Sequence, residues 1–549
     1  MSNIVRSSML LTGATFLSKF LGMIYLIPFN ALVGAEGGAL YSFAYVPYTI
    51  MLSISTIGLP LAMSKIVSKY NALGDYETGR RMFKHGTNLM LFTGIISFLI
   101  LFFGAEILAH GFIEENSSNT ITVADVTKVI RMVSFALIII PAMSIVRGFF
   151  QGYESMGPTA ISQVVEQLAR ILFVLISVFI VIKVLGGTIA TAVGFATFGA
   201  FIGAIASAFV LILYWRYRKP YLDRQLEHQK FSSNHTTKDL FKELFSYAGP
   251  FIIVALATSL YQLVDQFTFQ RAMIAAGFED IWEVALGSIN TYGHKLVILP
   301  GTIATGLSLA ILPALTKTFA QKNMVMVHQQ INQALQIVLV LVIPAVVGLV
   351  ALAKEAYGAL YGLEDIEITG TLMAWYAPVG LLFALFTVTA SILQGINQQN
   401  YTVFSLLGGL LAKVLLNAQL IHMFGAKGSI IGTALAVGIA VAMNLWRIKI
   451  AVRFSFRQIR KRTLLIGIFS AIMCIVIWLI KLVIGIFIDY EESRLGMIIM
   501  LILGVGLGGG VYLWLAYSST LIERVFGGRV PLVGKIKGKL NKLRARSNK

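Results

Sequence analysis

Charged residues and cysteine are scarce in this sequence. Asp, Glu, Lys and Arg together make up 13% of the 549 residues, whereas hydrophobic residues make up 57%. Soluble domains carry roughly twice that share of charge, so the composition excludes a chain of soluble domains and indicates a polytopic membrane protein. Cys474 is the only cysteine, which excludes a disulfide within the chain.

Signatures of catalysis are missing as well. The sequence holds no Walker loop, so the chain is not itself an ATP-driven pump. Its His and Cys residues show no metal-ligand spacing, and its predicted outer loops lack the compact acidic motif of glycosyltransferases that use lipid-linked sugars. We therefore expect a protein that is not an enzyme and that uses no metal and no cofactor.

Long apolar runs fill most of the chain. A run of about 20 apolar residues is long enough to cross a bilayer as a helix. The sequence thus predicts an all-α polytopic membrane protein with fourteen transmembrane helices, at residues 9–33, 38–63, 86–108, 129–150, 158–182, 188–214, 244–270, 285–314, 328–353, 370–393, 401–423, 428–450, 463–487 and 495–518.

The basic residues support this count and predict a topology. The net charge is +19, and 32 of the 44 basic residues fall on one side when the predicted spans alternate. Because basic loops stay in the cytoplasm, we expect both termini to be cytoplasmic. The acidic residues of the opposite side are Glu114, Glu115, Asp125, Glu279, Asp280, Glu283, Glu364, Asp365, Glu367, Asp489, Glu491 and Glu492.

One stretch of the chain occurs twice. The sequence QGYESMGPTAISQVVEQLARI, which begins at Gln151, aligns with QGINQQNYTVFSLLGGLLAKV, which begins at Gln394. The offset of 243 residues places Arg170 over Lys413. Self-similarity at a long period fixes architecture, and in membrane proteins it is a recurrent way of building transporters.

A second repeat supports two related halves. GLPLAMSKIVSK at 58–69 aligns with GLSLAILPALTK at 306–317, an offset of 248 residues. We therefore expect two pseudo-symmetric six-helix lobes plus two extra C-terminal helices. The predicted division is an N-lobe at 1–218, a cytoplasmic linker at 219–243, a C-lobe at 244–453, the two extra helices at 454–518 and a basic cytoplasmic tail at 519–549.

Four cations lie about midway through predicted spans, where a charge is costly and is a functional candidate by default. They are Lys19, Arg170, Lys295 and Lys413, each roughly 15–20 Å from the start of its span. We expect the three lysines to line a wet central cavity that binds an anionic ligand, because lysine and arginine are the usual ligands of phosphates. Polar neighbours expected to contact the same ligand are Ser18, His294 and Asn417.

Few acidic residues are available in the spans to neutralise these cations. Glu166 lies one turn before Arg170, so the two form either a structural pair or part of the ligand site. The same two roles stay open for Asp265. Lys413 has Gly409 where Arg170 has its glutamate, so we expect Lys413 to lack a partner and to contact substrate, and Arg170 to hold its lobe together.

Four stretches resemble one family of transporters: LSKFLGMIYLIPF, GLPLAMSKIVSKYNALGDYETGRRMFK, RGFFQGYESMGPTAISQVVEQLAR and YGHKLVILPGTIATGLSLAILPALTK. On these residues the chain resembles the MurJ/MviN group of the multidrug/oligosaccharidyl-lipid/polysaccharide (MOP) exporter superfamily, and within it the Gram-positive, YtgP-like lipid II flippases. The resemblance covers essentially the whole chain, including the two extra C-terminal spans.

The resemblance implies a flippase of the bacterial cell membrane. Such a protein moves lipid II, the lipid-linked peptidoglycan precursor, from the inner to the outer leaflet by alternating access. It holds the diphosphate in a cationic cavity and the polyprenyl tail in a groove beside spans thirteen and fourteen. Family basic residues in spans one and eight fall on Lys19, which follows Ser18, and on Lys295.

The chain also departs from the family pattern. Family arginines of spans one and two are Tyr25 and Met51 here. Some members have a sodium site with Asn and Asp one turn apart in span eleven, where this chain has Lys413 and Asn417. The lysine argues against the same sodium site and leaves open how transport is coupled.

Other functions and partners stay open. Export of another undecaprenyl-diphosphate glycolipid would use the same cationic cavity, whereas export of cationic drugs predicts acidic cavity residues. A non-transporting scaffold for cell-wall synthesis proteins leaves the mid-membrane lysines without a role. The basic tail is expected to contact anionic membrane lipids, and nucleic acid is not an expected partner because the tail lacks stacking aromatic residues.

Overall fold

The computed structural model describes residues 3–56, 59–114, 120–227, 229, 237–487 and 489–526. Within these ranges, side chains are described except at residues 3–12, 59–62, 237–255, 303, 305, 308–310, 313, 487 and 526. The predicted tail from residue 527 onward lies outside the described residues, as do residue 58 of the second repeat and residues 228 and 230–236 of the predicted linker.

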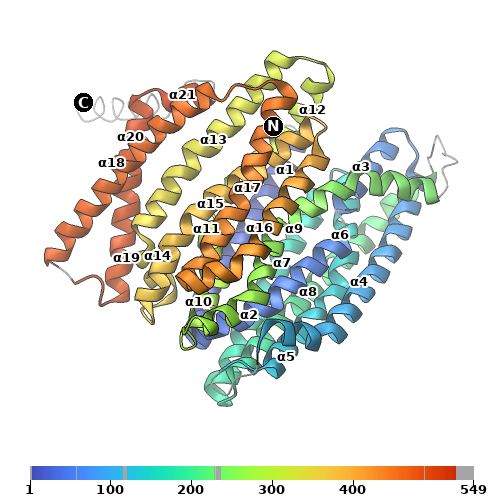
Figure 1. Ribbon diagram of the computed structural model, residues 1–549. Helices are drawn as coiled ribbons and strands as arrows, with labels where there is room; N and C mark the ends of the chain where they lie inside the picture. The colour runs from blue at the N-terminus through green and yellow to red at the C-terminus, as the bar shows by residue number, and fades with distance from the viewer. Residues whose placement is uncertain are drawn as a thin grey trace, which may run out of the picture. The chain divides into compact units, whose positions relative to one another are not determined.

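Every described secondary-structure element is a helix (Figure 1). The first half of the chain forms α1 (Asn3–Ile24), α2 (Leu26–Thr56), α3 (Leu59–Ala72), α4 (Tyr76–Phe112), α5 (Val123–Ser134), α6 (Ala136–Gly152), α7 (Met156–Phe179), η1 (Ile180–Val184), α8 (Ile189–Glu227) and α9 (Thr237–Ala275). The second half forms α10 (Trp282–Gly287), η2 (Ser288–Gly293), α11 (His294–Ile298), α12 (Gly301–Ala320), α13 (Met324–Ala351), α14 (Ala353–Tyr361), α15 (Ile366–Gly395), α16 (Gln399–Phe424), α17 (Ala426–Val452), α18 (Arg457–Phe487), α19 (Arg494–Leu503), η3 (Gly504–Gly508), α20 (Gly509–Ser518) and α21 (Leu521–Phe526).

The predicted all-α membrane architecture is confirmed. Ten helical segments among the described residues are long and apolar enough to cross a membrane, and each coincides with one predicted span. A further pair, Gly13–Ile24 with Leu26–Thr56, is bent by 41° and covers the first two predicted spans. Helix α9 coincides with predicted span seven, and α10 to α12 coincide with span eight. The count of fourteen therefore stays a prediction, because length and hydropathy give ten or eleven spans.

The helices form two compact units. The first contains the residues up to Leu296 together with 360–376 and 402–440, and the second contains 297–359, 377–401 and the residues from Val441 onward. These units are defined by internal contacts, so they are not the predicted six-helix lobes, which stay a prediction. Much of the predicted linker is helical, because α8 continues to Glu227 and α9 begins at Thr237.

The turn that precedes α7 is repeated before α16. Glu154 and Asn397, which are 243 positions apart, have φ angles of 57° and 58°, in the left-handed region that few residues other than glycine adopt. In each copy the following amide donates to the carbonyl five residues earlier, at 3.0 and 2.7 Å. The duplication seen in the sequence thus extends to the backbone of the turn.

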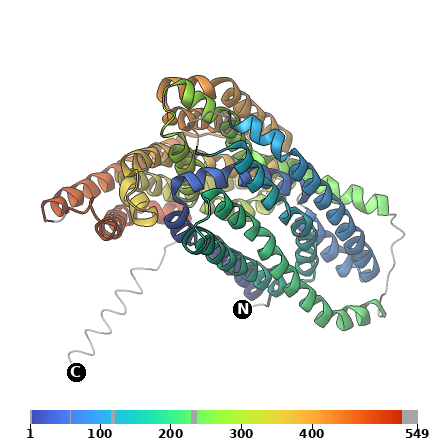
Figure 2. The ribbon, with the colours of Figure 1, turned by 90° about the horizontal axis from the view of Figure 1, so that it is seen from below.

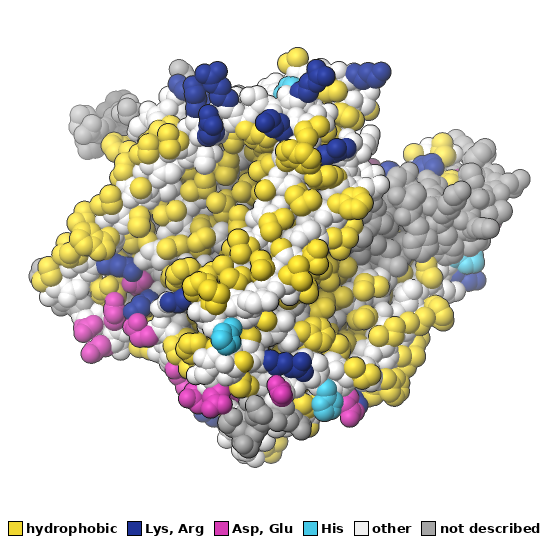
Figure 3. All heavy atoms as spheres, in the orientation of Figure 1, with side chains coloured by type: hydrophobic (Ala, Val, Ile, Leu, Met, Phe, Trp, Pro, Cys, Tyr) yellow, Lys and Arg dark blue, Asp and Glu magenta, His cyan; other side chains and the backbone are white. Residues whose placement is uncertain are grey.

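In the second unit, α13, α18 and α20 lie side by side (Figures 1 and 2). Charge is sorted along α18, whose first turns carry Arg457, Arg460, Lys461 and Arg462 and whose end is followed by Asp489, Glu491 and Glu492. Figure 3 shows basic side chains along the edge where α18 begins and acidic side chains along the edge where it ends. A helix with an apolar centre and opposite charges at its ends suits a membrane span.

Helices α7 and α8 pack closely against each other at a glycine. A Cβ atom added at Gly203 of α8 would lie 2.7 Å from the Glu166 carbonyl oxygen and 3.2 Å from the Arg170 Cβ atom. Both distances are too short for undisturbed packing, so this glycine sets the position of the α7 segment that carries a predicted site cation.

We therefore expect Gly203→Ala to lower stability by about 1–3 kcal/mol through overpacking of α7 against α8. Gly104→Ala is the matched control, because Gly104 also lies inside a helix and has no atom within 4 Å of an added Cβ. The control gains helix propensity and is expected to keep or raise the melting temperature of the purified protein in detergent. Equal melting temperatures for the two variants would contradict the close approach.

Candidate functional site

The four mid-span cations lie on α1, α7, α11 and α16, all within the first unit. They differ in how completely the protein surrounds them. Lys413 is 1% exposed, Arg170 and Lys295 are partly buried, and Lys19 is exposed. Lys413 is therefore the least accessible of the four to a ligand.

A row of tyrosines on α2 brings two of the cations together. Tyr41, Tyr45 and Tyr48 are four and three residues apart, which places them on one face of the helix. Successive ring centroids are separated by 5.4 and 5.7 Å. Tyr41 and Tyr48 are buried, whereas Tyr45 is partly exposed. We call these three residues the tyrosine row.

Lys295 contacts the middle of the tyrosine row. Its Nζ atom lies 5.4 Å from the centre of the Tyr45 ring, within the range of a cation–π interaction. Helix α11, which carries Lys295, follows the π-helical turn η2, and η2 is fixed to α2. Thr291 Oγ1 donates to the Gly38 carbonyl oxygen at 2.7 Å, and Tyr292 donates to a second α2 carbonyl at 2.9 Å. These two hydrogen bonds hold Lys295 against the row.

Arg170 contacts the same row from α7. Its guanidinium lies near enough to the Tyr48 side chain for the two to interact electrostatically. Its Nη2 atom lies 3.6 Å from Glu166 Oε1, so the predicted i,i+4 pair is confirmed. Arg147 of α6 takes the other carboxylate oxygen at the shorter distance of 2.8 Å. Two guanidinium groups therefore share one carboxylate, and this group keeps a net positive charge.

Lys19 lies on the face of α1 that packs on α7. Thr15 Oγ1 donates to Gln163 Oε1 at 3.2 Å, and a Cβ atom added at Gly22 would lie 3.0 Å from Gln167 Nε2. Residues 15, 19 and 22 share one helical face, so Lys19 falls between these two contacts. The side chain of Lys19 is exposed, while the hydroxyl of neighbouring Ser18 is buried with no hydrogen-bond partner in the described part of the chain.

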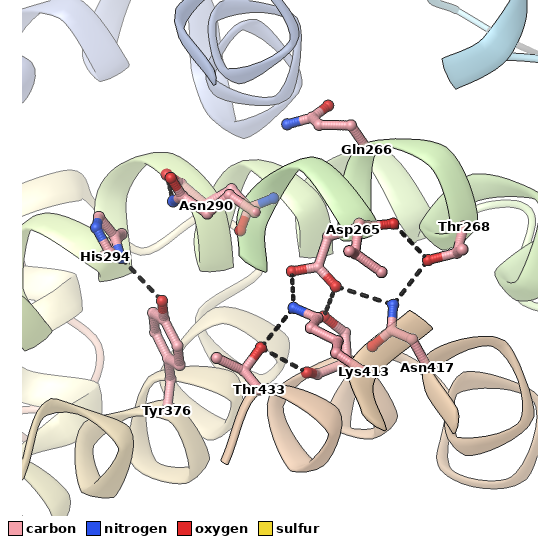
Figure 4. A network of polar contacts seen from close by, with 12 residues as sticks. Asp265, Gln266, Thr268, Asn290, His294, Tyr376, Lys413, Asn417 and Thr433 are labelled. Carbon is pink, nitrogen blue, oxygen red and sulfur yellow. Dashed lines mark hydrogen bonds and ion pairs between the residues drawn. The ribbon is translucent and has the colours of Figure 1, made fainter. Parts of the chain in front are cut away.

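Lys413 lies at the centre of a buried polar network that joins α9, α16 and α17 (Figure 4). Its Nζ atom donates to Asp265 Oδ2 and to Thr433 Oγ1, each at 2.7 Å. The other Asp265 oxygen accepts from Asn417 Nδ2 at 3.0 Å and from Ser429 Oγ at 2.7 Å. The Lys413 and Asp265 side chains are 0% and 3% exposed, so this is a fully enclosed ion pair.

The expectation that Lys413 lacks an acidic partner is wrong. Its own helix offers none, but Asp265 comes from α9, 148 residues earlier in the chain. Asn417 is also committed, because its amide donates to Thr268 Oγ1 at 2.7 Å as well as to the carboxylate. Asp265 is thus the counter-ion of Lys413, and the pair is enclosed by protein.

His294 also has an internal partner. Its Nδ1 atom lies 2.8 Å from the Tyr376 hydroxyl, and the side chain is 9% exposed (Figure 4). The residue follows η2, and π-helical turns are frequent at functional sites. Its neighbour Lys295 points instead to the tyrosine row, since adjacent residues of a helix face different directions.

Two parts of this site are not predicted from the sequence. The tyrosine row has a visible signal, since three tyrosines at helical spacing share a face. Arg147 falls near the end of the predicted span at 129–150 and has no pattern that marks it as a site residue. The structure places it within α6, where it also donates to Ser162 and Ser207 at 3.0 and 2.7 Å. No local pattern identifies these partners.

Known proteins are similar to this chain in sequence and in fold. The polysaccharide biosynthesis protein family matches residues 4–319. The lipid II flippase MurJ of Bacillus subtilis (strain 168) is 43% identical over 532 residues, which cover 96% of this chain and 98% of that protein. A solved structure of lipid II flippase MurJ in an inward closed conformation gives a TM-score of 0.66 at 19% identity, covering 94% of this chain and 99% of that one. An inward-facing multidrug resistance MATE family transporter gives 0.63 at 16% identity, covering 78% of this chain and 95% of that one.

The buried network leads to a stability prediction. Lys413→Met leaves the Asp265 carboxylate buried without its cation, so we expect a loss of about 3–5 kcal/mol. The double variant with Asp265→Asn removes both charges and is expected to recover much of that loss. Thermal unfolding of the purified protein in detergent measures both, as a double-mutant cycle. Additive effects of the two substitutions would show that the pair is not coupled.

Proposed function

Because this chain belongs to the lipid II flippase MurJ family, within the polysaccharide biosynthesis proteins, we propose that it moves lipid II from the inner to the outer leaflet of the bacterial cell membrane. The reaction is transport by alternating access and breaks no covalent bond. The observation within the structure that carries this proposal is the meeting of Lys295 and Arg170 at one tyrosine row.

Lys295, Arg170 and Lys19 are the proposed ligands of the diphosphate. None of the three is enclosed in a closed ion pair like that of Lys413, so each can still attract an anion. Lysine acts on phosphate as a point charge, and arginine binds it through a planar fork of donors. Tyrosine hydroxyls of the row add donors, and Ser18 and His294 flank the lysines. Lys413 and Asn417 are assigned to the fold rather than to the ligand.

The polyprenyl tail is proposed to bind in an apolar groove of the second unit. A cavity of about 360 Å³ is lined by α13, α18, α19, η3 and α20, with Pro344, Met473, Leu501 and Leu513 among its walls. The one tyrosine of its lining, Tyr512, donates a hydrogen bond from its hydroxyl to the Val340 carbonyl at 2.7 Å. This hydroxyl is therefore already hydrogen-bonded within the protein. An apolar wall of this kind suits a hydrocarbon chain.

The proposed topology places both termini in the cytoplasm, with the basic start of α18 on the same side. The tail from residue 527 is proposed to contact anionic lipids, and cell-wall synthesis proteins remain proposed partners. The buried Lys413 ammonium supplies a fixed positive charge where some family members have a sodium site, which supports coupling to another driving force. Membrane potential provides about 2.3 kcal/mol per charge moved through 100 mV.

Three alternative functions would require different residues at the site. Export of another undecaprenyl-linked oligosaccharide needs the same cations and differs only in its sugar contacts. Export of cationic drugs, as in MATE transporters, needs exposed acids, whereas Asp265 and Glu166 are both committed to cations. A scaffold for wall-synthesis enzymes needs no transport. Depletion of the protein separates these alternatives through the lipid-linked precursor that accumulates in the inner leaflet.

Neutralising the proposed ligands is expected to stop transport. In cells where this chain is the sole flippase, Lys295→Gln, Arg170→Gln or Lys19→Gln should each reduce lipid II export at least tenfold, because a charge-assisted hydrogen bond contributes about 1.5–3 kcal/mol. The measurement is the amount of lipid II accessible at the outer leaflet, with membrane levels of each variant determined in parallel.

Two variants serve as controls for this experiment. Lys183→Gln removes an exposed cation from η1 and is expected to leave export unchanged, whereas Lys295→Arg keeps the charge and is expected to retain part of the activity. Normal growth and export in a Lys19→Gln/Lys295→Gln double variant would refute the assignment of these ligands.

The single native cysteine makes the topology testable. In a Cys474→Ser background, Glu492→Cys lies beyond the end of α18 and Gln321→Cys lies just after α12. A membrane-impermeant maleimide is expected to label Glu492→Cys in intact cells, and to label Gln321→Cys only after the membrane is permeabilised. The reverse pattern would invert the proposed orientation.

A further inference from the structure

Two cavities of the first unit share a wall formed by α4 and α8. One has a volume of about 390 Å³ and is lined by side chains of α4, α6 and α8, nearly all apolar; we call it the apolar slot. The other, of about 590 Å³, is lined by α4 and α8 and carries most of the nearby charge; we call it the cationic pocket. Phe83, Thr87 and Trp215 line both, so the two cavities are adjacent.

The apolar slot has no unsatisfied hydroxyl. Thr87 is the one hydroxyl-bearing residue of its lining, and Thr87 Oγ1 donates to the Phe83 carbonyl at 2.8 Å. Phe83 and Trp215 stack with ring centroids 4.7 Å apart and form the shared wall. Leu91 and Ile212, further along the slot, are 39% and 51% exposed, so the slot opens on the outer face of the unit.

The cationic pocket has an excess of positive charge. Its lining holds Arg80, Arg81, Lys84 and Lys219 with a single acid, Glu77, and a nearby histidine, His85. Arg80 is paired with Asp223 of α8 at 2.6 Å. Lys84 and Lys219 are exposed and make no ion pair within the described part of the chain. Two uncompensated lysines, one from each helix, therefore face the pocket.

The junction of the two cavities coincides with a change of polarity along the chain. Helix α4 is charged up to His85 and then runs apolar from Leu89 onward, and α8 changes from apolar to basic on either side of Trp215. Tryptophan is enriched where the hydrocarbon of a bilayer meets the headgroups. The cationic pocket thus lies at headgroup level and the apolar slot at acyl-chain level.

We propose that the apolar slot and the cationic pocket together bind one anionic glycerophospholipid, such as phosphatidylglycerol. Its phosphate contacts Lys84 and Lys219, and one acyl chain passes Trp215 into the slot. A free phosphate would leave the slot without a ligand, and a zwitterionic lipid would bring a cation to the two lysines. This site differs from the proposed transport site, and its ligand is not the transported molecule.

Lipid binding is measured by native mass spectrometry of the delipidated full-length protein. Dioleoyl-phosphatidylglycerol is expected to bind more tightly than dioleoyl-phosphatidylcholine, which has the same chains. Lys84→Gln/Lys219→Gln is expected to weaken phosphatidylglycerol binding about tenfold, since each basic residue at an anionic lipid surface contributes severalfold in affinity. Ala142→Phe narrows the slot without changing a charge and is expected to weaken both lipids.

A matched control removes two other exposed lysines of the same unit, as Lys128→Gln/Lys183→Gln, and is expected to bind like the wild type. Equal affinity for the two lipids, or an equal loss in the control, would overturn the proposal. Displacement of phosphatidylglycerol by millimolar inorganic phosphate would instead identify a soluble-anion site. Displacement by a polyprenyl diphosphate would assign the cavities to the transported substrate.

Discussion

The cost of a charge inside a membrane governs this structure. Hydrocarbon cannot solvate an ion, so each buried charge must be paired, hydrogen-bonded or left in contact with water. The first unit does all three. Lys413 is completely enclosed with Asp265, Arg170 shares one carboxylate with Arg147, Lys295 lies over an aromatic ring, and Lys19 is exposed. This gradation is the basis for proposing that Lys413 is structural and that the other three cations bind the ligand.

The enclosed Lys413–Asp265 pair shows how a buried charge is stabilised when every charged atom has a hydrogen-bond partner. Every charged atom of the Lys413–Asp265 pair that the structure records is hydrogen-bonded, and the partners come from three helices. A buried ion pair adds little net stability over apolar packing, but breaking one side of it is expensive. The network therefore favours one register of α9 against α16 and α17. A ligand would have to displace several of these bonds to reach the lysine.

The features that could be predicted from the sequence are those that depend on a local pattern of residues. Apolar runs gave the helices, the offset of 243 residues gave the duplicated turn, and spacing along one helix gave the Arg170–Glu166 pair. The sequence does not predict partners that meet only through tertiary packing. Asp265 and Lys413 are 148 residues apart, and a glycine at the matching position of the repeat suggested a free lysine. Arg147 was missed for the same reason, since its partners lie on α7 and α8.

For reversible binding, a cation must be able to leave its partner within the protein at a small cost in free energy. Arg170 meets this condition because Glu166 has a second cation. The carboxylate of Glu166 lies 2.8 Å from Arg147 and 3.6 Å from Arg170. If Arg170 turned to a phosphate, as proposed, the carboxylate would keep Arg147 and would not be left buried without a partner. Among the described residues Asp265 has no second cation, so the release of Lys413 would leave this buried carboxylate without a counter-ion. The repeat thus places two equivalent cations in unequal surroundings, one exchangeable and one fixed.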